Sequence, residues 1–583
     1  MEYSRVAEAY EKMEKTRKRL ELIDILTKLL VDTPTEMIEK IVYLTQGKIK
    51  PDFYGIELGM SDKLVIRALE KTTSMSSNEI QEQYNKIGDL GEVTKMALEK
   101  KAQTTLIKQE LTVERVHKTF EDIATTTGQG SIEMKLAKLS GLLSDCSPIE
   151  GKYIIRTFTG ILRLGIADYT VLDALSIAFT NDKANRKYLE KAYNISGDLG
   201  KVAKTVAQEG LDELNKIKIT VGNPIRPMLA ERLSSADEII KKIEGKVGIE
   251  YKLDGERLQI HLNKQVVKIF SRSLENITAH YPDVERIMKK LKIENMIIEA
   301  EAVAIDNKSN NFLPFQELMH RRRKHRIEEA VKNYPISINL FDILYLNDKD
   351  LTDHTYKKRR EILENITKKS KDLNIIKQTI TDNPEKINNF LEKSIEEGCE
   401  GLVIKDLNGT YRAGAREYLW IKLKKEYNTE MSDTLDLVVI GGIYGKGKRV
   451  NTYGALLLAS YDKESNKFRS FCKVGTGFTD ENLRLIYDKL QKNKINEKYI
   501  TIDSKMQADV WFKPNLVIEI SGTEITLSPI HTSNKNEIRK NFGLALRFPI
   551  FTGRIREDKL PQDVTTTMEI RKLYEKQLKK VLK

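Results

Sequence analysis

An internal repeat in the first 220 residues constrains the fold of this chain more than any other feature. The segments YNKIGDLGEVTKMALEK, from Tyr84, and YNISGDLGKVAKTVAQEG, from Tyr193, share Tyr-Asn, Gly-Asp-Leu-Gly, Val and Lys in register. Apolar residues recur throughout this region at three- and four-residue spacing, which is typical of amphipathic helices. Residues 1–220 are therefore predicted to form an all-α domain with an internal duplication.

In each copy, Gly-Asp-Leu-Gly comes immediately before a helical run. The second glycine would leave backbone N–H groups open at a helix N-terminus, where a phosphate can bind. Alternatively, Asp89 and Asp198 cap their helices in a tight helix–helix turn, which needs no ligand. The sequence leaves both interpretations open.

The composition changes after the helical region. A glycine and two prolines in VGNPIRPMLA, from Val221, indicate a linker and the entry to a second domain. Strand-like runs such as KVGIEYK, RLQIHL and CEGLVIKD then alternate with helical patterns, so residues 221–427 are predicted to form an α+β domain. Short strands with glycine turns predict a β-barrel of the OB type over residues 428–583, followed by a basic C-terminal helix. We therefore expect a multi-domain protein.

Charge and cysteine content narrow the class of partner and the compartment. The formal charge of +13 favours a polyanionic partner such as nucleic acid, because Lys and Arg that neutralise phosphates release condensed counterions. A charged surface that only maintains solubility is the alternative. Three cysteines without a CxxC pair exclude a disulfide framework and a four-cysteine zinc site, and no long apolar run predicts a membrane span.

The sharpest local pattern is Glu250-Tyr-Lys252-Leu-Asp254-Gly255-Glu-Arg257. Asp-Gly predicts a hairpin turn that would bring Arg257 onto the strand beside Lys252, and strand alternation places Glu250 and Lys252 on one face. A lysine next to an arginine that can hold phosphate oxygens is suited to attack a phosphate. The pattern indicates a nucleotidyl-lysine intermediate, with a plain surface hairpin as the alternative.

In order and spacing, this motif and five others resemble the covalent nucleotidyltransferases, and specifically the ATP-dependent DNA ligases of archaeal and eukaryotic type. The motifs are Lys252-x-Asp-Gly-x-Arg257, Ser271-Arg272-Ser273, Ile298-Glu-Ala-Glu301, Phe341-Asp-Ile-Leu, Glu400-Gly-Leu-Val-Ile-Lys405, and Arg416 followed by Trp420-Ile-Lys422-Leu-Lys424. The resemblance covers almost the whole chain. It implies that nicks in duplex DNA are sealed through a lysyl-AMP intermediate, with ATP and Mg2+, in replication, repair and recombination.

The resemblance also implies a role for each matching residue. Lys252 would carry AMP, Glu250 would read the adenine amino group, and Phe341 would stack on the adenine ring. The residues that would line the nucleotide are Arg257, Arg272, Glu301, Arg416 and Lys422, with Lys424 facing the α-phosphate. Glu301 and Glu400 would support Mg2+, because carboxylate oxygens suit this hard cation. Taken singly, Phe341 could be ordinary strand core, and Lys422 and Lys424 an exposed basic edge.

Near the C-terminus, the segment from Arg547 to Lys559 resembles the last motif of these ligases, whose arginine and lysine orient the pyrophosphate. The spacing between Pro549 and Asp558 is one residue longer than the common pattern. Arg554 and Arg556 are therefore both candidates for that role.

Two more segments bear on partners. Seven successive basic residues, His320–Arg326, predict a contact to the DNA backbone, with a solvated helix face as the alternative. Gln103, Leu106 and Ile107 resemble a sliding-clamp peptide, although the usual aromatic pair is missing and an amphipathic turn is the alternative. We expect a cytoplasmic monomer, associated with the nucleoid in a prokaryote, that binds nicked duplex DNA.

Other functions fit the sequence less well. An RNA ligase and a GTP-using capping guanylyltransferase share the Lys252 motif, but the duplicated helical domain argues against both. An NAD-dependent ligase is disfavoured because three cysteines are too few for the zinc module of that family. A non-catalytic DNA-binding protein is disfavoured by the complete set of reactive residues.

Overall fold

The computed structural model describes residues 1–583 except 57, 59, 101–109, 307–311, 314, 322–326, 369, 425–433, 446–448, 450–451 and 582–583. The chain divides into two compact units, Met1–Ser77 with Thr94–Lys425 and Asn78–Val93 with Glu426–Lys583. The division into three domains at 220/221 and 427/428 stays a prediction. In the described parts of the chain, no helix is long and apolar enough to cross a membrane.

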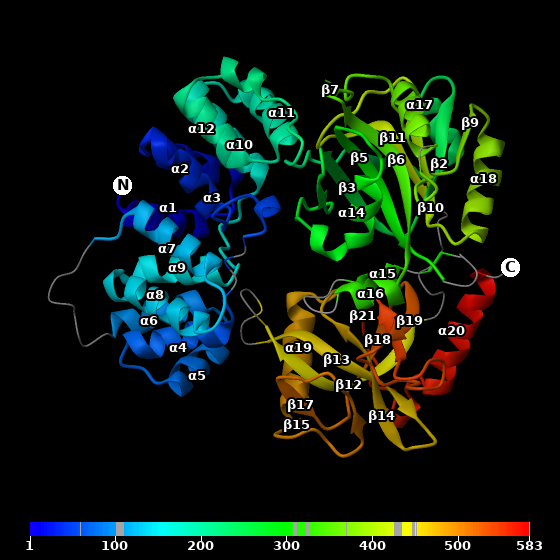
Figure 1. Cartoon of the computed structure of the whole chain (residues 1–583). Helices are drawn as coiled ribbons and strands as arrows, with labels where there is room; N and C mark the ends of the chain where they lie inside the picture. The colour runs from blue at the N-terminus through cyan, green and yellow to red at the C-terminus, as the bar shows by residue number, and fades with distance from the viewer. Residues whose placement is uncertain are drawn as a thin grey trace. The chain divides into compact units, whose positions relative to one another are not determined.

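The predicted helical character of the first 220 residues is confirmed (Figure 1). Capping signals explain several helix starts: Ser147 and Glu150 form a capping box at α9, where Pro148 occupies the first turn. The α-helices of this region are α1 (Tyr3–Glu14), α2 (Arg19–Val31), α3 (Ile38–Thr45), α4 (Asp62–Thr72), α5 (Ser77–Ile87), α6 (Leu90–Glu99), α7 (Val113–Thr125), α8 (Ser131–Asp145), α9 (Pro148–Phe158), α10 (Asp168–Thr180), α11 (Arg186–Ser196) and α12 (Leu199–Gln208).

Both copies of the repeat form the same helix–turn–helix. Gly88 follows α5 and Gly197 follows α11, with positive φ angles of 67° and 65°, which glycine adopts without strain. Asp89 and Asp198 then cap α6 and α12, each accepting a backbone N–H of the following helix, at 2.8 and 2.9 Å. The capping interpretation of the motif is confirmed.

The second glycine of the C-terminal copy has a packing explanation. A Cβ atom on Gly200 would lie 2.3 Å from the ring of Tyr43 in α3. The hydroxyl of Tyr43 donates to Asp198 at 2.7 Å, which fixes the ring against the turn. Close approach of α12 and α3 therefore accounts for Gly200 without a bound phosphate, and the phosphate interpretation stays a prediction.

Two sheets follow, as the α+β prediction requires. The five-stranded sheet has the order β1 (Leu229–Arg232), β11 (Arg416–Lys424), β10 (Gly401–Asp406), β2 (Val247–Lys252) and β9 (Gln378–Thr381). The six-stranded sheet has the order β4 (Val266–Phe270), β3 (Glu256–Asn263), β5 (Asn295–Ala304), β6 (Ile336–Leu346) and β7 (Lys349–Asp350), and β8 (Asn374–Ile375) pairs with β6. The helices between these strands are α13 (Ala236–Lys242), α14 (Pro282–Lys289), α15 (Phe315–Met319), α16 (Ile327–Asn333), α17 (Tyr356–Thr367) and α18 (Pro384–Glu396).

Each sheet has its own apolar core. Ile239 of α13 and Ile387 of α18 are buried in the core of the five-stranded sheet. Val284 of α14 and Leu363 of α17 are buried in the core of the six-stranded sheet. Most residues of β2 and β5 are buried, although these strands carry Glu250, Lys252, Glu299 and Glu301 among their apolar residues.

The C-terminal region is a curled, mainly antiparallel sheet, consistent with the predicted OB fold. Its strands are β12 (Leu435–Tyr444), β13 (Tyr453–Asp462), β14 (Lys467–Val474), β15 (Lys494–Ile495), β16 (Ile502–Asp503), β17 (Val510–Phe512), β18 (Val517–Ser521) and β21 (Ile550–Ile555), with β19 (Glu524–Ser528) and β20 (Gly543–Arg547) as a separate pair. Helix α19 (Asp480–Gln491) lies within it in sequence, and the predicted C-terminal helix is α20 (Thr567–Val581). Ile570 and Tyr574 of α20 are buried in the core of this region.

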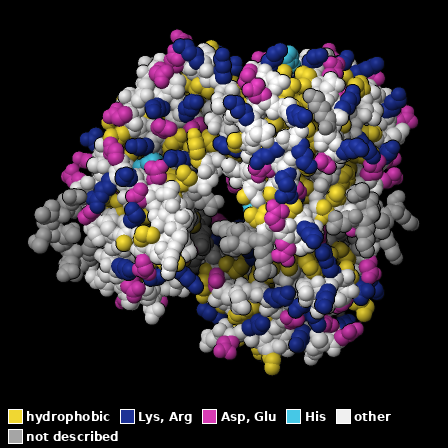
Figure 2. All heavy atoms as spheres, viewed as in Figure 1, with side chains coloured by type: hydrophobic (Ala, Val, Ile, Leu, Met, Phe, Trp, Pro, Cys, Tyr) yellow, Lys and Arg dark blue, Asp and Glu magenta, His cyan; other side chains and the backbone are white. Residues whose placement is uncertain are grey.

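Charged side chains of both signs are mixed on one face of the molecule. On the face drawn in Figure 2, Lys and Arg side chains lie interspersed with Asp and Glu. Within the basic run His320–Arg326, Arg321 is buried and donates to both oxygens of Asp283, at 2.7 and 2.8 Å. The predicted DNA contact is therefore wrong for Arg321, because a buried, paired guanidinium cannot reach a phosphate. Residues 322–326 lie outside the described part of the chain, as do Gln103, Leu106 and Ile107.

The linker after the helical region is hydrogen-bonded to side chains of β3. The N–H of Ile225 donates to Gln259 at 2.7 Å, and the side-chain amide of Gln259 donates back to the carbonyl of Ile225 at 3.0 Å. The N–H of Gly222 donates to Nδ1 of His261 at 2.9 Å, so the neutral imidazole carries its proton on Nε2. Burial, with a smaller contribution from Lys268, lowers the pKa of His261 to about 3.

Acid is expected to weaken the fold through His261. At pH 5 the unfolded chain protonates this imidazole and the folded chain does not, so the free energy of unfolding falls by about 2 kcal/mol relative to pH 8. The loss grows as the pH falls from about 6.5 toward 3. Urea unfolding of the wild type and His261→Gln at both pH values measures it. The difference in free energy of unfolding between the wild type and His261→Gln should be smaller at pH 5 than at pH 8. An equal difference at both pH values would contradict the lowered pKa of His261.

Candidate active site

The register of the five-stranded sheet brings four site residues into two adjacent rows. β10 lies between β2 and β11, and Gly401 of β10 is opposite both Lys252 and Lys424. In the next row on this face, Val403 lies between Glu250 and Lys422. Side chains two residues apart on a strand share a face, so these four polar side chains point to the same side of the sheet. The predicted pairing of Lys422 and Lys424 on one strand face is confirmed.

Gly401 lets the first row come together. Its φ is +145°, and a Cβ atom at this position would lie 2.3 Å from the carbonyl oxygen of Leu423 on β11. Any side chain here would therefore push β11 away from β10 and separate Lys424 from Lys252.

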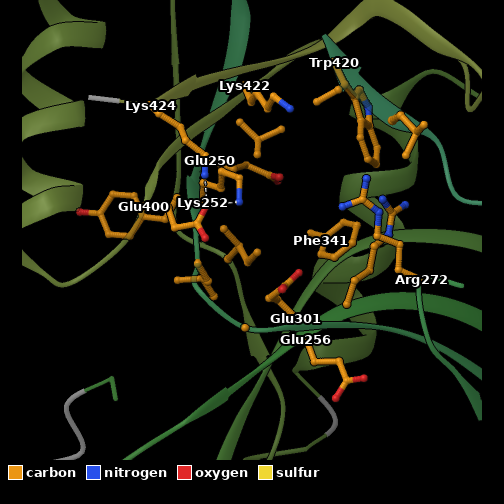
Figure 3. A pocket seen from close by; sticks show the side chains of 18 of the residues that line it. Glu250, Lys252, Glu256, Arg272, Glu301, Phe341, Glu400, Trp420, Lys422 and Lys424 are labelled. Atoms are coloured by element: carbon orange, nitrogen blue, oxygen red, sulfur yellow. Dashed lines mark hydrogen bonds and ion pairs between the residues drawn. The ribbon is translucent and has the colours of Figure 1, made fainter. Parts of the chain in front are cut away.

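Glu400 joins the two lysines of this row (Figure 3). Its Oε2 lies 2.5 Å from Nζ of Lys252 and 2.6 Å from Nζ of Lys424. Its backbone N–H donates to the carbonyl of Lys252 at 2.8 Å. Burial alone would raise the pKa of Glu400, but the two ammonium groups outweigh it and lower the pKa to about 2. Glu400 is therefore an anion throughout the physiological pH range.

A cavity of about 530 Å3 opens beside this cluster, and we call it the Lys252 cavity. All ten predicted site residues of the first unit line it: Glu250, Lys252, Arg257, Arg272, Glu301, Phe341, Glu400, Arg416, Lys422 and Lys424. In Figure 3, Phe341, Trp420 and Arg272 lie across the cavity from Lys252 and Glu400. Lysines thus gather at one end of the cavity, and aromatic rings with arginines at the other.

The accumulated positive charge favours an anionic ligand. Burial, and after it the nearby charges of Arg416 and Lys424, lower the pKa of Lys422. Cations that lower one another's pKa repel one another. Phosphate oxygens that enter the cavity stabilise these cations, because each phosphate charge relieves the repulsion. A polyphosphate bound at this end would meet Lys252 directly.

Arg257 reaches the cavity by a route that the sequence did not predict. The expected Asp254–Gly255 hairpin is wrong, because β2 and β3 belong to different sheets. Gly255 allows the crossing: a Cβ atom there would lie 2.3 Å from the carbonyl oxygen of Ala302 on β5. Close backbone approach, rather than a tight turn, accounts for the glycine.

The guanidinium of Arg257 is held at the aromatic end of the cavity. It donates to both oxygens of buried Glu299 at 2.8 Å and to the carbonyl of Met228 at 2.8 Å. It also lies 5.3 Å from the ring centroid of Phe341 and 5.6 Å from that of Trp420, so it packs against both rings. These contacts keep Arg257 in place before any ligand arrives.

The second predicted metal ligand, Glu301, lies opposite Arg257 in the register of β5 and β3. Burial raises its pKa to about 7; Lys252 and Arg257 oppose the rise, and the carboxylates of Glu400 and Asp254 add to it. A divalent cation would relieve this repulsion. No group of three or more metal-binding side chains was found among the described residues, but Mg2+ in phosphate sites commonly uses only one or two carboxylates. The residues present therefore fit Mg2+.

Arg554 and Arg556 belong to the second unit. The side chain of Arg554 is 74% exposed and lies 3.5 Å from Glu519. Arg556 is more enclosed and pairs with Asp436 at 2.7 Å and with Asp558 at 2.7 Å. Asp436 also pairs with Lys559, at 2.6 Å, so Arg556 and Lys559 are tied to one carboxylate.

Several residues that line the cavity had no role assigned from the sequence. They are Leu229, Ala230, Tyr251, Leu253, Gly255, Glu256, Ser271, Ser273, Phe315, Ile376, Val403, Lys405 and Trp420. Lys405 and Trp420 stand in the quoted motifs, and they occupy facing positions on β10 and β11. Their place within ordered motifs was the signal that could have identified them.

Comparison with known proteins gives a consistent result over nearly the whole chain. Three family models match: "DNA ligase N terminus" over residues 2–176, "ATP dependent DNA ligase domain" over 227–424, and "ATP dependent DNA ligase C terminal region" over 449–559. The DNA ligase of Nitrosopumilus maritimus is 52% identical over 580 residues, with 99% of each chain covered. The DNA ligase of Cenarchaeum symbiosum is 49% identical over 582 residues, covering 100% of this chain and 99% of the relative. A solved structure described as "Pmar-Lig_PreS3" has a TM-score of 0.54 at 18% identity, covering 94% of this chain and 99% of the other, and so shares the fold.

Proposed function

The chain belongs to the ATP-dependent DNA ligase family, and on that premise we propose that it seals nicks in duplex DNA through an AMP group carried on Lys252. It is an enzyme that uses ATP and forms phosphodiester bonds. The observation that carries the role of Lys252 is its position: Nζ is 2.5 Å from Glu400 in a cavity that is also lined by Arg272, Lys422 and Lys424. We infer that the reaction serves DNA replication, repair and recombination.

Three phosphoryl-type transfers would use this one site. Lys252 must first lose a proton from its ammonium group; the free amine then attacks the α-phosphorus of ATP, forms a P–N bond and releases pyrophosphate. The 5'-phosphate of the nick then takes the AMP from Lys252, and the 3'-hydroxyl finally displaces AMP to close the backbone. Throughout, Lys422 and Lys424 would neutralise charge on the α-phosphate as bonds change.

Binding of the nucleotide would be divided between the two ends of the cavity. Phe341 would stack on the adenine ring, and Glu250 would accept a hydrogen bond from its amino group. Arg257, Arg272 and Arg416 would line the remainder of the nucleotide. The hydrogen bonds of Arg257 to Glu299 and to the carbonyl of Met228 support a fixed cation beside the base and ribose.

Glu301 and Glu400 would hold Mg2+. Burial and, after it, the nearby carboxylates raise the pKa of Glu301 to about 7; the cation would relieve that carboxylate repulsion and neutralise phosphate charge during transfer. Without the cation, Glu301 is partly protonated near neutral pH and so adds less negative charge beside the incoming phosphates.

The other regions would contribute to DNA binding and to the first transfer. We propose three domains: a helical DNA-binding domain at 1–220, an adenylation domain at 221–427, and an OB-fold barrel at 428–583. Arg554 or Arg556 would orient the pyrophosphate, and the exposure of Arg554 supports its availability. Monomeric action in the cytoplasm and a clamp contact through residues 103–107 stay predictions.

Labelling with ATP tests this proposal. Incubation of the protein with α-labelled ATP and Mg2+ is expected to give a covalently labelled protein, and added nicked duplex DNA should remove the label as sealed product appears. Label obtained from GTP would instead favour capping chemistry, and transfer to nicked RNA alone would favour an RNA ligase. Absence of label from any nucleotide would contradict a covalent intermediate.

A further inference from the structure

Glu250 is enclosed by groups that no part of the proposed reaction requires. It is 1% exposed, yet it lines the Lys252 cavity. Its Oε1 accepts from Arg360 at 2.8 Å and from the hydroxyl of Tyr356, both on α17. Its Oε2 lies 2.7 Å from Nζ of Lys405 on β10. A buried carboxylate with two cations and a hydroxyl around it is held in a single position.

Lys405 also connects Glu250 to the aromatic end of the cavity. Its ammonium donates to the carbonyl of Phe341 at 3.0 Å and lies 4.4 Å from the ring centroid of Trp420. Arg360 makes a parallel connection, because it donates to the carbonyl of Ile376, another cavity residue, at 2.7 Å. The two cations therefore fix the carboxylate and the backbone of its neighbours together.

The hydrogen bonds leave one acceptor position on this carboxylate. An ionised carboxylate offers about four lone-pair sites and no donor. Among the described residues, Oε1 accepts from Tyr356 and Arg360, with Gln378 at 3.5 Å, whereas the donor to Oε2 is Lys405. The free position on Oε2 can accept a hydrogen bond but cannot donate one.

We propose that Lys405, Arg360 and Tyr356 are positioning residues that hold Glu250 as a fixed, acceptor-only carboxylate and so make the cavity select adenine over other purines. The proposal rests on the proposed role of Glu250 toward the nucleotide. Adenine presents a 6-amino donor to such a group. Guanine presents a carbonyl oxygen at the same place, which an ionised carboxylate repels.

Two analogues separate this effect from general binding. Purine riboside triphosphate lacks the 6-amino group, and GTP replaces it with an oxygen. We expect the wild type to prefer ATP to purine riboside triphosphate by about 10- to 100-fold in kcat/KM for self-labelling, the size of one hydrogen bond to a charged group. In Lys405→Met this preference should fall at least about fivefold, and GTP should become a better substrate.

Milder and matched variants keep the test decisive. Tyr356→Phe removes one donor and keeps both cations, so it should lower the same preference about two- to threefold even if Lys405→Met folds poorly. Arg359→Met is the control: Arg359 precedes Arg360 on α17, is also buried and pairs with Asp342 at 2.7 Å. Arg359→Met should lower the melting temperature and leave the ATP preference unchanged. If Lys405 had a purely structural role, Lys405→Met would behave in the same way.

Glu250→Leu, which removes the acceptor oxygens, separates the two possible failures. A lower ATP preference in folded Glu250→Leu with no change in folded Lys405→Met and Tyr356→Phe would overturn the positioning role alone. An unchanged preference in folded Glu250→Leu would overturn both the proposed contact of Glu250 with adenine and the positioning role. Arg360→Lys, which keeps the charge, is expected to retain more of the preference than Arg360→Met.

Discussion

Replacement of Lys252 by alanine is expected to slow the transfer of AMP from ATP to the protein by at least about 10^4-fold, because the side chain that forms the covalent bond is lost. The lysines nearest to the site cannot substitute for it. Lys424 comes from β11, on the far side of Gly401 from Lys252, and pairs with Glu400 at 2.6 Å. The measurement is the rate of label incorporation from α-labelled ATP in a single turnover.

The same variant should retain the last chemical step. A nick that already carries AMP on its 5'-phosphate needs no lysine nucleophile, so Lys252→Ala should seal it within about tenfold of the wild type. Lys246→Ala is the matched control, since Lys246 is exposed and directly precedes β2. Equal loss of both activities in Lys252→Ala would mean that Lys252 supports the structure of the site rather than forming the intermediate.

Glu400→Gln is expected to have the second-largest effect, a loss of about 10^2- to 10^3-fold in label incorporation, the usual magnitude for one electrostatic group at a reacting centre. The change keeps the shape of the side chain and removes its charge. Lys252 and Lys424 would lose the anion that lies 2.5 and 2.6 Å away, and a proposed Mg2+ ligand would be weakened. Measurement at several Mg2+ concentrations should show a raised Mg2+ requirement as well as a lower maximal rate.

Unlike Lys252→Ala, the Glu400→Gln variant should also seal a pre-adenylated nick slowly, because Lys424 and the cation would act in every step. Glu397→Gln is the control: Glu397 is three residues away and pairs with Lys377 at 2.5 Å, and it is not among the residues that line the cavity. A normal rate on the pre-adenylated nick in Glu400→Gln would restrict the role of Glu400 to positioning Lys252.

The sequence predicted those parts of the site that depend on strand alternation. The runs that contain Lys252, Glu301, Phe341 and Lys422 became β2, β5, β6 and β11, and alternation placed Glu250 with Lys252 and Lys422 with Lys424. Helical spacing predicted the first 220 residues for the same reason: the periodicity of apolar residues is a local property of the chain.

Features that depend on contacts between distant segments were not predictable. An Asp-Gly pair is a good hairpin former, but Gly255 serves a crossing between two sheets because it must pass close to Ala302. Arg321 stands in a basic run, yet it is buried against Asp283. Likewise, no residue near Glu250 in the sequence predicts its contact with Arg360, which belongs to a helix more than a hundred positions later.

The two-residue spacing of Glu250 and Lys252 on β2 also restricts how genes for this protein can change length. Insertion or loss of a single codon between them would turn one of the two side chains to the opposite face of the sheet, and every pairing with Gly401 and Val403 would shift. Restoring the original strand register would need a second, compensating insertion or deletion in the same strand. Length variation among descendants of this gene should therefore collect in the loops between strands and spare β2 altogether.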